Sequence, residues 1–251
     1  MRAAGLVVAR ALERVAAAVR PGVTTGALDA LAEQSIRDDG AVPAFLGYAG
    51  FPATLCTSVG AEVVHGIPSP SRVLRAGDLL SVDCGAVLDG WHGDAAVTVP
   101  VGDCPPELRA LSAVTERALW AGLAAARPGG RLSDIGAAVE AAVRPHGYGL
   151  VTEYTGHGIG RALHEPPDVP NLAADGAGRG PVLEPGLVLA VEPMVVLGGP
   201  AVHELADGWT VVTDDGRAAA HWEHTVAVTP DGPVVLTALD AGAAASLPRR
   251  P

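Results

Sequence analysis

The stretch from Asp78 to Thr98, DLLSVDCGAVLDGWHGDAAVT, constrains the fold most, because it reads as two strands joined by a tight turn. Asp89-Gly90 is a strong turn dipeptide, and the apolar runs on either side of it predict strands. Each strand carries one aspartate, so Asp83 and Asp94 are predicted to lie nearly opposite each other. Two buried aspartates repel each other unless they share a proton or bind cations. The pair alone leaves open whether one of them faces solvent.

A weak internal repeat gives the hairpin a counterpart later in the chain. Residues 77–88, GDLLSVDCGAVL, align without a gap on residues 186–197, GLVLAVEPMVVL. This alignment sets Asp83 on Glu192. Duplicated halves that pack face to face would bring acids at matched positions together. We therefore expect these two carboxylates to meet at the seam between the halves.

A second repeated motif supports the same division of the chain. Arg-Pro-Gly occurs at residues 20–22 and again at residues 127–129, each time before a helix-like segment. The length is sufficient for one large domain. We predict a single domain over residues 1–251, with related halves at about 1–104 and 105–251.

The pattern of apolar residues and of turn signals predicts the remaining elements. Four amphipathic helices are expected to cover the sheet, one ending before Pro21 and the others over residues 25–39, 105–127 and 133–145. Further strands are expected at residues 55–59, 209–213 and 221–229. The stretch 166–186 is rich in Pro, Asp and Gly and is predicted to be a surface excursion.

Charge and hydropathy exclude two classes of partner. The formal net charge is −11 and the chain contains no lysine, whereas a nucleic-acid-binding face needs clustered positive charge. The apolar N-terminal stretch is interrupted by Arg10, Glu13 and Arg14, so it reads as an amphipathic helix and predicts neither a signal peptide nor a membrane span.

Cysteine usage indicates the compartment. The three cysteines form no CxxC motif, and any disulfide scheme leaves one of them unpaired; they are Cys56, Cys84 and Cys104. This pattern favours a reducing environment, so we expect a cytoplasmic protein.

Four carboxylates and one imidazole on predicted strands or tight turns suggest a metal centre: Asp83, Asp94, His157, Glu192 and Glu223. A lone histidine is more often a hydrogen-bonding residue than a ligand, but glycines on both sides of His157 permit close backbone approach. Two divalent cations would balance the four negative charges and would lower the pKa of a bound water from 15.7 toward ~7. An oxygen-rich ligand set favours cobalt, manganese or iron, with zinc also possible.

Several segments together resemble the type I methionine aminopeptidases of the pita-bread metallopeptidases, a family that also contains prolidase, X-Pro aminopeptidase and creatinase. The matching segments are LGYAGFP, VVHGIP, SVDCGAVLDGWHGD, YTGHGIGRALHEPP, VEPMV, DGWTVVT and WEHTVAVT. The resemblance implies an α+β pita-bread fold, in which two pseudo-symmetric halves share a central antiparallel β-sheet covered by helices.

The resemblance also implies a role for each candidate ligand. Asp83 would chelate one metal ion, Asp94 and Glu223 would bridge two ions, and His157 with Glu192 would complete the other. Glu192 would also carry a proton from the attacking water to the departing amine. By the same resemblance, two divalent ions are expected in each chain.

Residues that contact the substrate follow from the resemblance as well. His164 would lie near the developing oxyanion and His65 near the peptide nitrogen. An apolar slot for the methionine side chain would be lined by Tyr48, Phe51, Cys56 and Trp209, with Phe45 and Leu163 beside them.

Five features depart from the family's usual pattern. Phe45 stands where well-known bacterial members have a smaller side chain, and Leu163 and Leu172 stand where aromatic residues or histidine are usual. Trp222 replaces the tyrosine or phenylalanine before Glu223. The chain also begins some residues into the family's first helix. None of these changes affects a ligand, so they bear on substrate preference and stability.

The resulting prediction is hydrolytic removal of the N-terminal methionine from nascent proteins, by a monomer that acts near the ribosome and prefers a small second residue. One alternative is a pita-bread aminopeptidase that cleaves before proline or acts on dipeptides, because that family shares the five ligands. A metal-free binding module is a different alternative, and it predicts lost ligands.

Overall fold

The computed structural model describes residues 1–173 and 179–239, and it confirms an α+β fold. Along the chain, two helices precede a run of strands and two more helices precede a second run of strands. All four predicted helices are present within about two residues of their expected ends. The helices are α1 (Arg2–Ala18), α2 (Thr25–Asp38), α3 (Pro106–Ala125) and α4 (Leu132–Val143), with 3₁₀ turns η1 (Tyr48–Gly50) and η2 (Arg144–His146). None of the described helices is long and apolar enough to cross a membrane.

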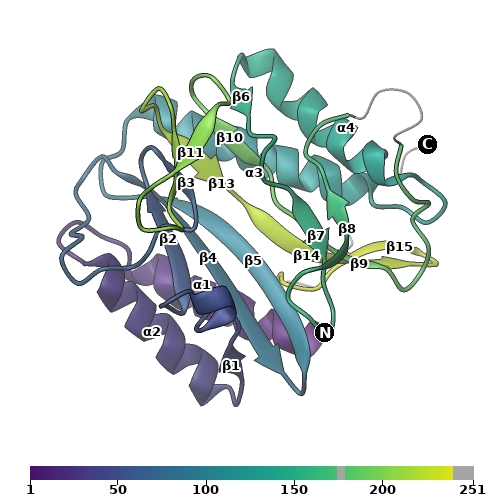
Figure 1. Cartoon of the computed structure of the whole chain (residues 1–251), viewed down its shortest axis with the longest axis horizontal. Helices are drawn as coiled ribbons and strands as arrows, with labels where there is room; N and C mark the ends of the chain where they lie inside the picture. Colours follow the sequence, from purple (N-terminus) through teal and green to yellow (C-terminus); the bar gives the residue numbers. More distant parts are fainter. Residues whose placement is uncertain (174–178, 240–251) are drawn as a thin grey trace.

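One large antiparallel sheet organises the described part of the chain. Its strands are β1 (Val42–Pro43), β2 (Leu55–Val59), β4 (Leu79–Leu88), β5 (Trp91–Pro100), β7 (Gly156–Gly158), β8 (Glu165–Val169), β9 (Val188–Val191), β14 (Glu223–Thr229) and β15 (Gly232–Val235). They follow the order β1-β4-β5-β14-β9-β7-β8, while β2 also pairs with β4 and β15 with β14. Strands from both ends of the chain therefore meet at its centre, where β14 lies between β5 and β9 (Figure 1).

Two small sheets complete the described strands. One has the order β13-β10-β6 and the other β11-β12-β3. Their bounds are β3 (Glu62–Val64), β6 (Gly149–Leu150), β10 (Met194–Val196), β11 (Val202–Glu204), β12 (Val211–Thr213) and β13 (Ala219–His221).

The helices cover the sheet in two pairs (Figure 1). Helix α1 packs on β4 and β5 and helix α2 packs on α1, β1 and β2, so that Val8 and Leu28 share a core with Val82. Helices α3 and α4 cover the other half, where Leu119 packs with Val191. Because every helix buries its apolar stripe against the sheet, the opposite sheet face remains available for polar side chains.

The central hairpin forms as predicted, but its register differs from the expected one. Asp89 and Gly90 form the turn with φ of 52° and 74°, the positive values that a two-residue turn of this hand requires. This turn pairs Asp83 with Ala96 and sets Asp94 opposite Gly85. The two aspartates are therefore diagonal neighbours on one sheet face, and the prediction that they lie nearly opposite each other was wrong by two residues.

One further prediction was wrong in part. The stretch 166–186 was expected to be a surface excursion, but β8 (Glu165–Val169) pairs with β7 in the large sheet. Two consecutive prolines in β8 do not prevent this, because β8 lies at the edge of the sheet and needs backbone donors on one side only. Residues 174–178 of this stretch lie outside the described part.

Candidate metal centre

Strand alternation places three of the five candidate ligands, Asp83, Asp94 and Glu223, on the sheet face that points away from the helices. In β4, Val82 and Cys84 pack into the core with α1 and α2, so Asp83 between them points to the other face. The same alternation applies along β5 to Asp94, beside the core residue Ala95. It applies in β14 to Glu223, whose neighbour Trp222 packs into the core of the other half. His157 in β7 and Glu192, which directly follows β9, line the same cavity as these three acids.

A corner between two strands fixes the position of Glu192. Strand β9 ends at Val191 and β10 begins at Met194, so Glu192 and Pro193 form the corner between two sheets. Asn171 donates its side-chain N–H to the Glu192 carbonyl at 3.1 Å. This corner directs Glu192 toward the other candidate ligands.

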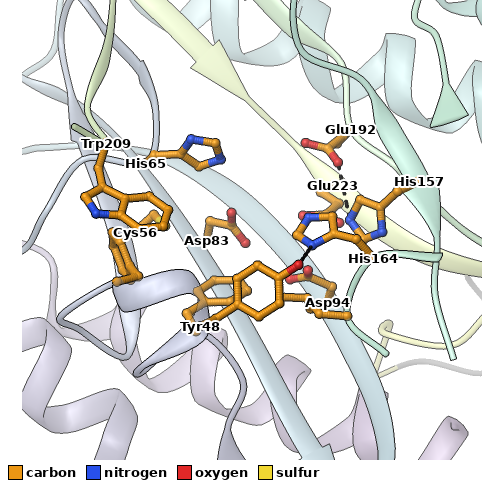
Figure 2. A pocket seen from close by; sticks show the side chains of 13 residues that line it. Tyr48, Cys56, His65, Asp83, Asp94, His157, His164, Glu192, Trp209 and Glu223 are labelled. Carbon is orange, nitrogen blue, oxygen red and sulfur yellow. Dashed lines mark hydrogen bonds and ion pairs between the residues drawn. The ribbon is translucent and has the colours of Figure 1, made fainter. Parts of the chain in front are cut away.

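All the predicted site residues line one cavity of about 240 Å³, which Figure 2 shows. Ten of these side chains are labelled there, with the carboxylates and histidines converging from both halves of the sheet. The lining residues are Phe45, Tyr48, Phe51, Cys56, His65, Asp83, Asp94, His157, Leu163, His164, Glu192, Trp209 and Glu223. The structure brings these residues together, and their chemical roles remain predictions.

Part of this cavity has the geometry of a cation site. Ligand atoms of Asp94, His157 and Glu223 all lie within 4.8 Å of one another, and the three residues are buried. Asp83 and Glu192 lie in the same cavity but outside this compact group. The compact group therefore contains two of the predicted bridging or chelating carboxylates and the predicted imidazole.

Unpaired oxygen atoms test whether these residues fit a metal. Oδ1 of Asp83, Oδ1 of Asp94 and Oε1 of Glu223 are buried and have no hydrogen-bond partner among the described residues. Leaving a buried acceptor unsatisfied is costly, and the cost is greater for a charged group. Divalent cations are the usual partners of such carboxylate oxygens, so the donor set fits them.

The acids strongly perturb one another. Burial raises the pKa of Asp83 to about 7, with a further rise from Glu192. Burial also raises the pKa of Glu192 to about 7. Burial and the neighbouring carboxylates raise the pKa of Asp94 and of Glu223 well above the usual range. Without cations, the cluster must therefore retain protons at neutral pH.

The histidines of the cavity are neutral, as metal binding requires. Burial lowers the pKa of His157, and its Nδ1 lies 2.9 Å from the Gly158 carbonyl, a position from which it donates. That donation leaves Nε2 with its lone pair, 3.6 Å from Oε1 of Glu192. Burial lowers the pKa of His65 to about 4, with a contribution from His221.

The apolar wall of the cavity forms a small hydrophobic cluster of its own. Phe45, Phe51, Cys56 and Leu163 are buried in it, and Trp209 packs against them. The Phe51 and Trp209 rings meet edge to face with centroids 5.0 Å apart. This cluster provides a slot beside the carboxylates that suits an unbranched apolar side chain.

The departures from the family pattern have local explanations. Phe45 and Leu163 pack in the same cluster, so a large aromatic residue and a smaller leucine fill it jointly. Trp222 points to the helix side, where its Nε1 donates to Ser112 Oγ at 3.0 Å. Leu172 packs against the core between α3 and α4. None of these residues displaces a candidate ligand.

Sequence reasoning missed one residue of this region, His221. Its side chain is 1% exposed, its Nε2 has no hydrogen-bond partner within residues 1–173 and 179–239, and that atom lies 3.5 Å from Oε2 of Glu192. The signal was its spacing, because a residue two positions before Glu223 tends to share the face of that acid. The intervening break between β13 and β14 at Trp222 makes this pattern hard to recognise in sequence.

Comparisons with known proteins agree with this geometry. Residues 1–230 match metallopeptidase family M24. The chain is 53% identical over 243 residues to methionine aminopeptidase 1 of Mycobacterium tuberculosis, covering 94% of this chain and 91% of that relative. It is also similar to the crystal structure of methionine aminopeptidase from Thermotoga maritima, with a TM-score of 0.92, 41% identity and 95% of each chain covered.

The prolidase-like alternative is more distant. The Xaa-Pro dipeptidase from Bacillus anthracis is 24% identical, with a TM-score of 0.74, and the match covers 94% of this chain but 59% of that one. This likeness shows a shared fold and carries no information about substrate.

Proposed function

The chain belongs to metallopeptidase family M24, and from that premise we propose how its residues remove the N-terminal methionine of a peptide. The chain is a hydrolase, a metal-dependent exopeptidase. Relatives that are 43–53% identical over more than nine-tenths of the chain are named methionine aminopeptidases, which supports this reaction. The observation that carries the proposal is the convergence of five ligand-type side chains beside an apolar slot.

The proposed ligands of the metal centre are the five predicted residues. Asp94 and Glu223 would bridge two divalent ions, Asp83 would chelate one, and His157 with Glu192 would complete the other. The four carboxylates offer a charge of −4, which two divalent ions balance, and three of them have unpaired buried oxygens in this structure. Cobalt, manganese or iron would suit this oxygen-rich set, with zinc possible.

Each catalytic group then has a defined task. Bound divalent ions would lower the pKa of water toward ~7 and polarise the scissile carbonyl. Glu192 would accept a proton and return it to the departing amine, a role that its position in the cavity beside His157 supports. His164 would donate to the carbonyl oxygen as negative charge develops there, and His65 would contact the peptide nitrogen.

The slot would select the methionine side chain. A thioether is flexible and polarisable, and it packs well against aromatic rings such as those of Phe51 and Trp209. Burial and the nearby carboxylates raise the pKa of Cys56 well above its usual range, which supports a neutral, apolar wall. We further propose a preference for a small second residue, on the family resemblance.

The proposed setting is the cytoplasm, where a monomer would act on nascent chains near the ribosome. The three cysteines are buried and unpaired in the structure, which supports a reducing environment. The proposed substrate supports action near the ribosome, because the N-terminal methionine is the first residue of a protein to be synthesised.

A peptide panel tests this proposal. Metal-stripped protein is resupplied with Co²⁺, Mn²⁺, Fe²⁺ or Zn²⁺ and incubated with Met-Ala-Ser, Met-Lys-Ser or Ala-Pro-Ser. We expect metal-dependent release of methionine from Met-Ala-Ser and little reaction with the other two. Cleavage of Ala-Pro-Ser alone would reassign the substrate class, and the absence of any cleavage would favour a binding role. Asp38→Asn, on the exposed end of α2, is a control for the loss of one carboxylate that does not line the cavity.

A further inference from the structure

The proposed function gives Tyr48 only an apolar role in the slot, yet its hydroxyl makes a specific contact. Tyr48 Oη lies 2.8 Å from Nδ1 of His164, although the two residues are 116 positions apart in the chain. Their rings are also in contact, with centroids 5.3 Å apart and planes tilted by 41°. Figure 2 shows this bond across one side of the cavity. A bond of this length and between these atoms can fix the orientation of an imidazole.

The turn that carries Tyr48 holds an unusual backbone. Ala49 has a φ of 47°, which residues with a Cβ adopt rarely, and glycines with φ of 85° and 90° lie at positions 47 and 50. Such left-handed conformations cost about 1–3 kcal/mol for a non-glycine residue and persist where the surroundings require them. Tyr48 is 42% exposed, so burial of its ring does not by itself account for this turn.

The backbone around His164 is anchored from the other side by the hairpin tip. The Arg161 guanidinium lies 3.7 Å from the centroid of the Trp91 ring, and it donates to the carbonyls of Asp89 and Gly90. These contacts fix the loop but leave the His164 side chain free to rotate. The Tyr48 hydroxyl and the neighbouring His157 ring, with its centroid 4.2 Å away, restrict that rotation.

The remaining question is which ring nitrogen carries the hydrogen. A neutral imidazole has one donor nitrogen and one acceptor nitrogen, and a tyrosine hydroxyl can take either role. Nε2 of His164 has no partner among the described residues, and the ring lines a cavity that contains four carboxylates. A phenol hydroxyl is a stronger hydrogen-bond donor than a neutral imidazole N–H, and an imidazole nitrogen is a stronger acceptor than a phenol oxygen, so the 2.8 Å bond is strongest when Tyr48 donates to Nδ1. The tautomer with hydrogen on Nε2 is therefore favoured, and Nδ1 then accepts from Tyr48.

We propose that Tyr48 is a positioning residue whose hydroxyl donates to Nδ1 of His164 and keeps the hydrogen of that imidazole on Nε2. His164 thereby presents a hydrogen-bond donor to the substrate carbonyl. The inference rests on the proposed function, in which His164 contacts that carbonyl. It assigns to the Tyr48 hydroxyl a role separate from the apolar contact of its ring.

The first test is the tautomer itself, in metal-stripped protein without substrate. Long-range ¹H–¹⁵N NMR of protein labelled at histidine distinguishes hydrogen on Nε2 from hydrogen on Nδ1, and His164→Gln identifies the signals. We expect hydrogen on Nε2 in the wild type and a mixed population in Tyr48→Phe. Hydrogen on Nδ1 in the wild type, or the same population in both proteins, would overturn the proposal.

The second test is kinetic and uses the metal-loaded enzyme with Met-Ala-Ser. Tyr48→Phe keeps the ring and removes the hydroxyl. We expect kcat to fall at least about tenfold, because the tautomer with hydrogen on Nδ1 cannot donate from Nε2 to the substrate carbonyl, while KM stays within about twofold. Tyr148→Phe, which removes the hydroxyl of a tyrosine packed near α3 and α4, is the matched control. An unchanged kcat, or a rise in KM alone, would show that Tyr48 serves only the slot. A wild type that releases no methionine would refute the proposed function instead, and the NMR result would still decide the tautomer.

Discussion

In the metal-free protein, the unfolding free energy of Asp83→Asn should rise relative to that of the wild type as the pH increases from 5 to 7.5. The pKa of this carboxyl is raised from 3.8 to about 7 by burial, so between these values the unfolded state ionises while the folded state keeps its proton. The folded wild type therefore loses stability as pH increases toward 7. Asparagine carries no such proton, and the variant escapes this loss.

The size of the effect follows from linkage. One pKa unit corresponds to 1.36 kcal/mol, and pH 5 lies about two pH units below the pKa of Asp83 in the folded protein. Between pH 5 and pH 7.5, the unfolding free energy of Asp83→Asn should thus rise by about 2.5 kcal/mol relative to that of the wild type. This figure covers the titration of Asp83 alone; the substitution also removes the charge that raises the pKa of Asp94, of Glu223 and of His221.

Urea unfolding of both metal-stripped proteins at the two pH values measures this difference, with Asp38→Asn as the control. A difference that stays constant, or that moves in favour of the wild type at pH 7.5, would refute the electrostatic reasoning. Adding the metal should reverse the order, since cations bind the ionised wild-type site and stabilise the folded state by about 2.7 kcal/mol at a concentration 100 times Kd.

Three other outcomes are expected. Asp94→Ala and Glu223→Ala should each abolish methionine release and reduce the metal-dependent rise in Tm, because each leaves buried charge uncompensated; full activity in both would contradict the dinuclear assignment. Gly66→Ala should lower the unfolding free energy by more than about 2 kcal/mol, measured in urea, because its Cβ would lie 2.3 Å from the Thr57 carbonyl oxygen; an unchanged midpoint would contradict this. Leu119→Ala, in a fully buried position, should cost about 2–5 kcal/mol in urea with kcat unchanged per folded molecule, and a loss below 1 kcal/mol would mean that α3 repacks.

The elements and the candidate site could be predicted because they rest on local patterns. The Asp-Gly turn and its flanking apolar residues specify the central hairpin within about twenty residues of chain. The repeat that sets Asp83 on Glu192 then predicts that two distant strands meet, and both side chains do line one cavity. Strand alternation determines the positions of Asp83, Asp94 and Glu223, since each has an apolar neighbour that packs into a helix-covered core.

Other features depend on contacts that no local pattern specifies. The register of Asp83 and Asp94 is a different case, because it follows from counting outward from the local turn, which the prediction did not do. Strand β8 pairs with β7 despite its two prolines, because β8 is an edge strand and needs backbone hydrogen bonds on one side only. The bond between Tyr48 and His164 joins two loops far apart in sequence, so only the folded structure shows it.

The most direct test of the account is a titration of metal-stripped protein with Co²⁺, in which methionine release from Met-Ala-Ser is measured at each metal equivalent. The account predicts no release without metal and a rise that ends at two equivalents per chain, since four carboxylates and one imidazole would hold two ions. Release that survives complete removal of the metal, or that never depends on the amount added, would contradict the claim that this cavity is a metal-dependent active site.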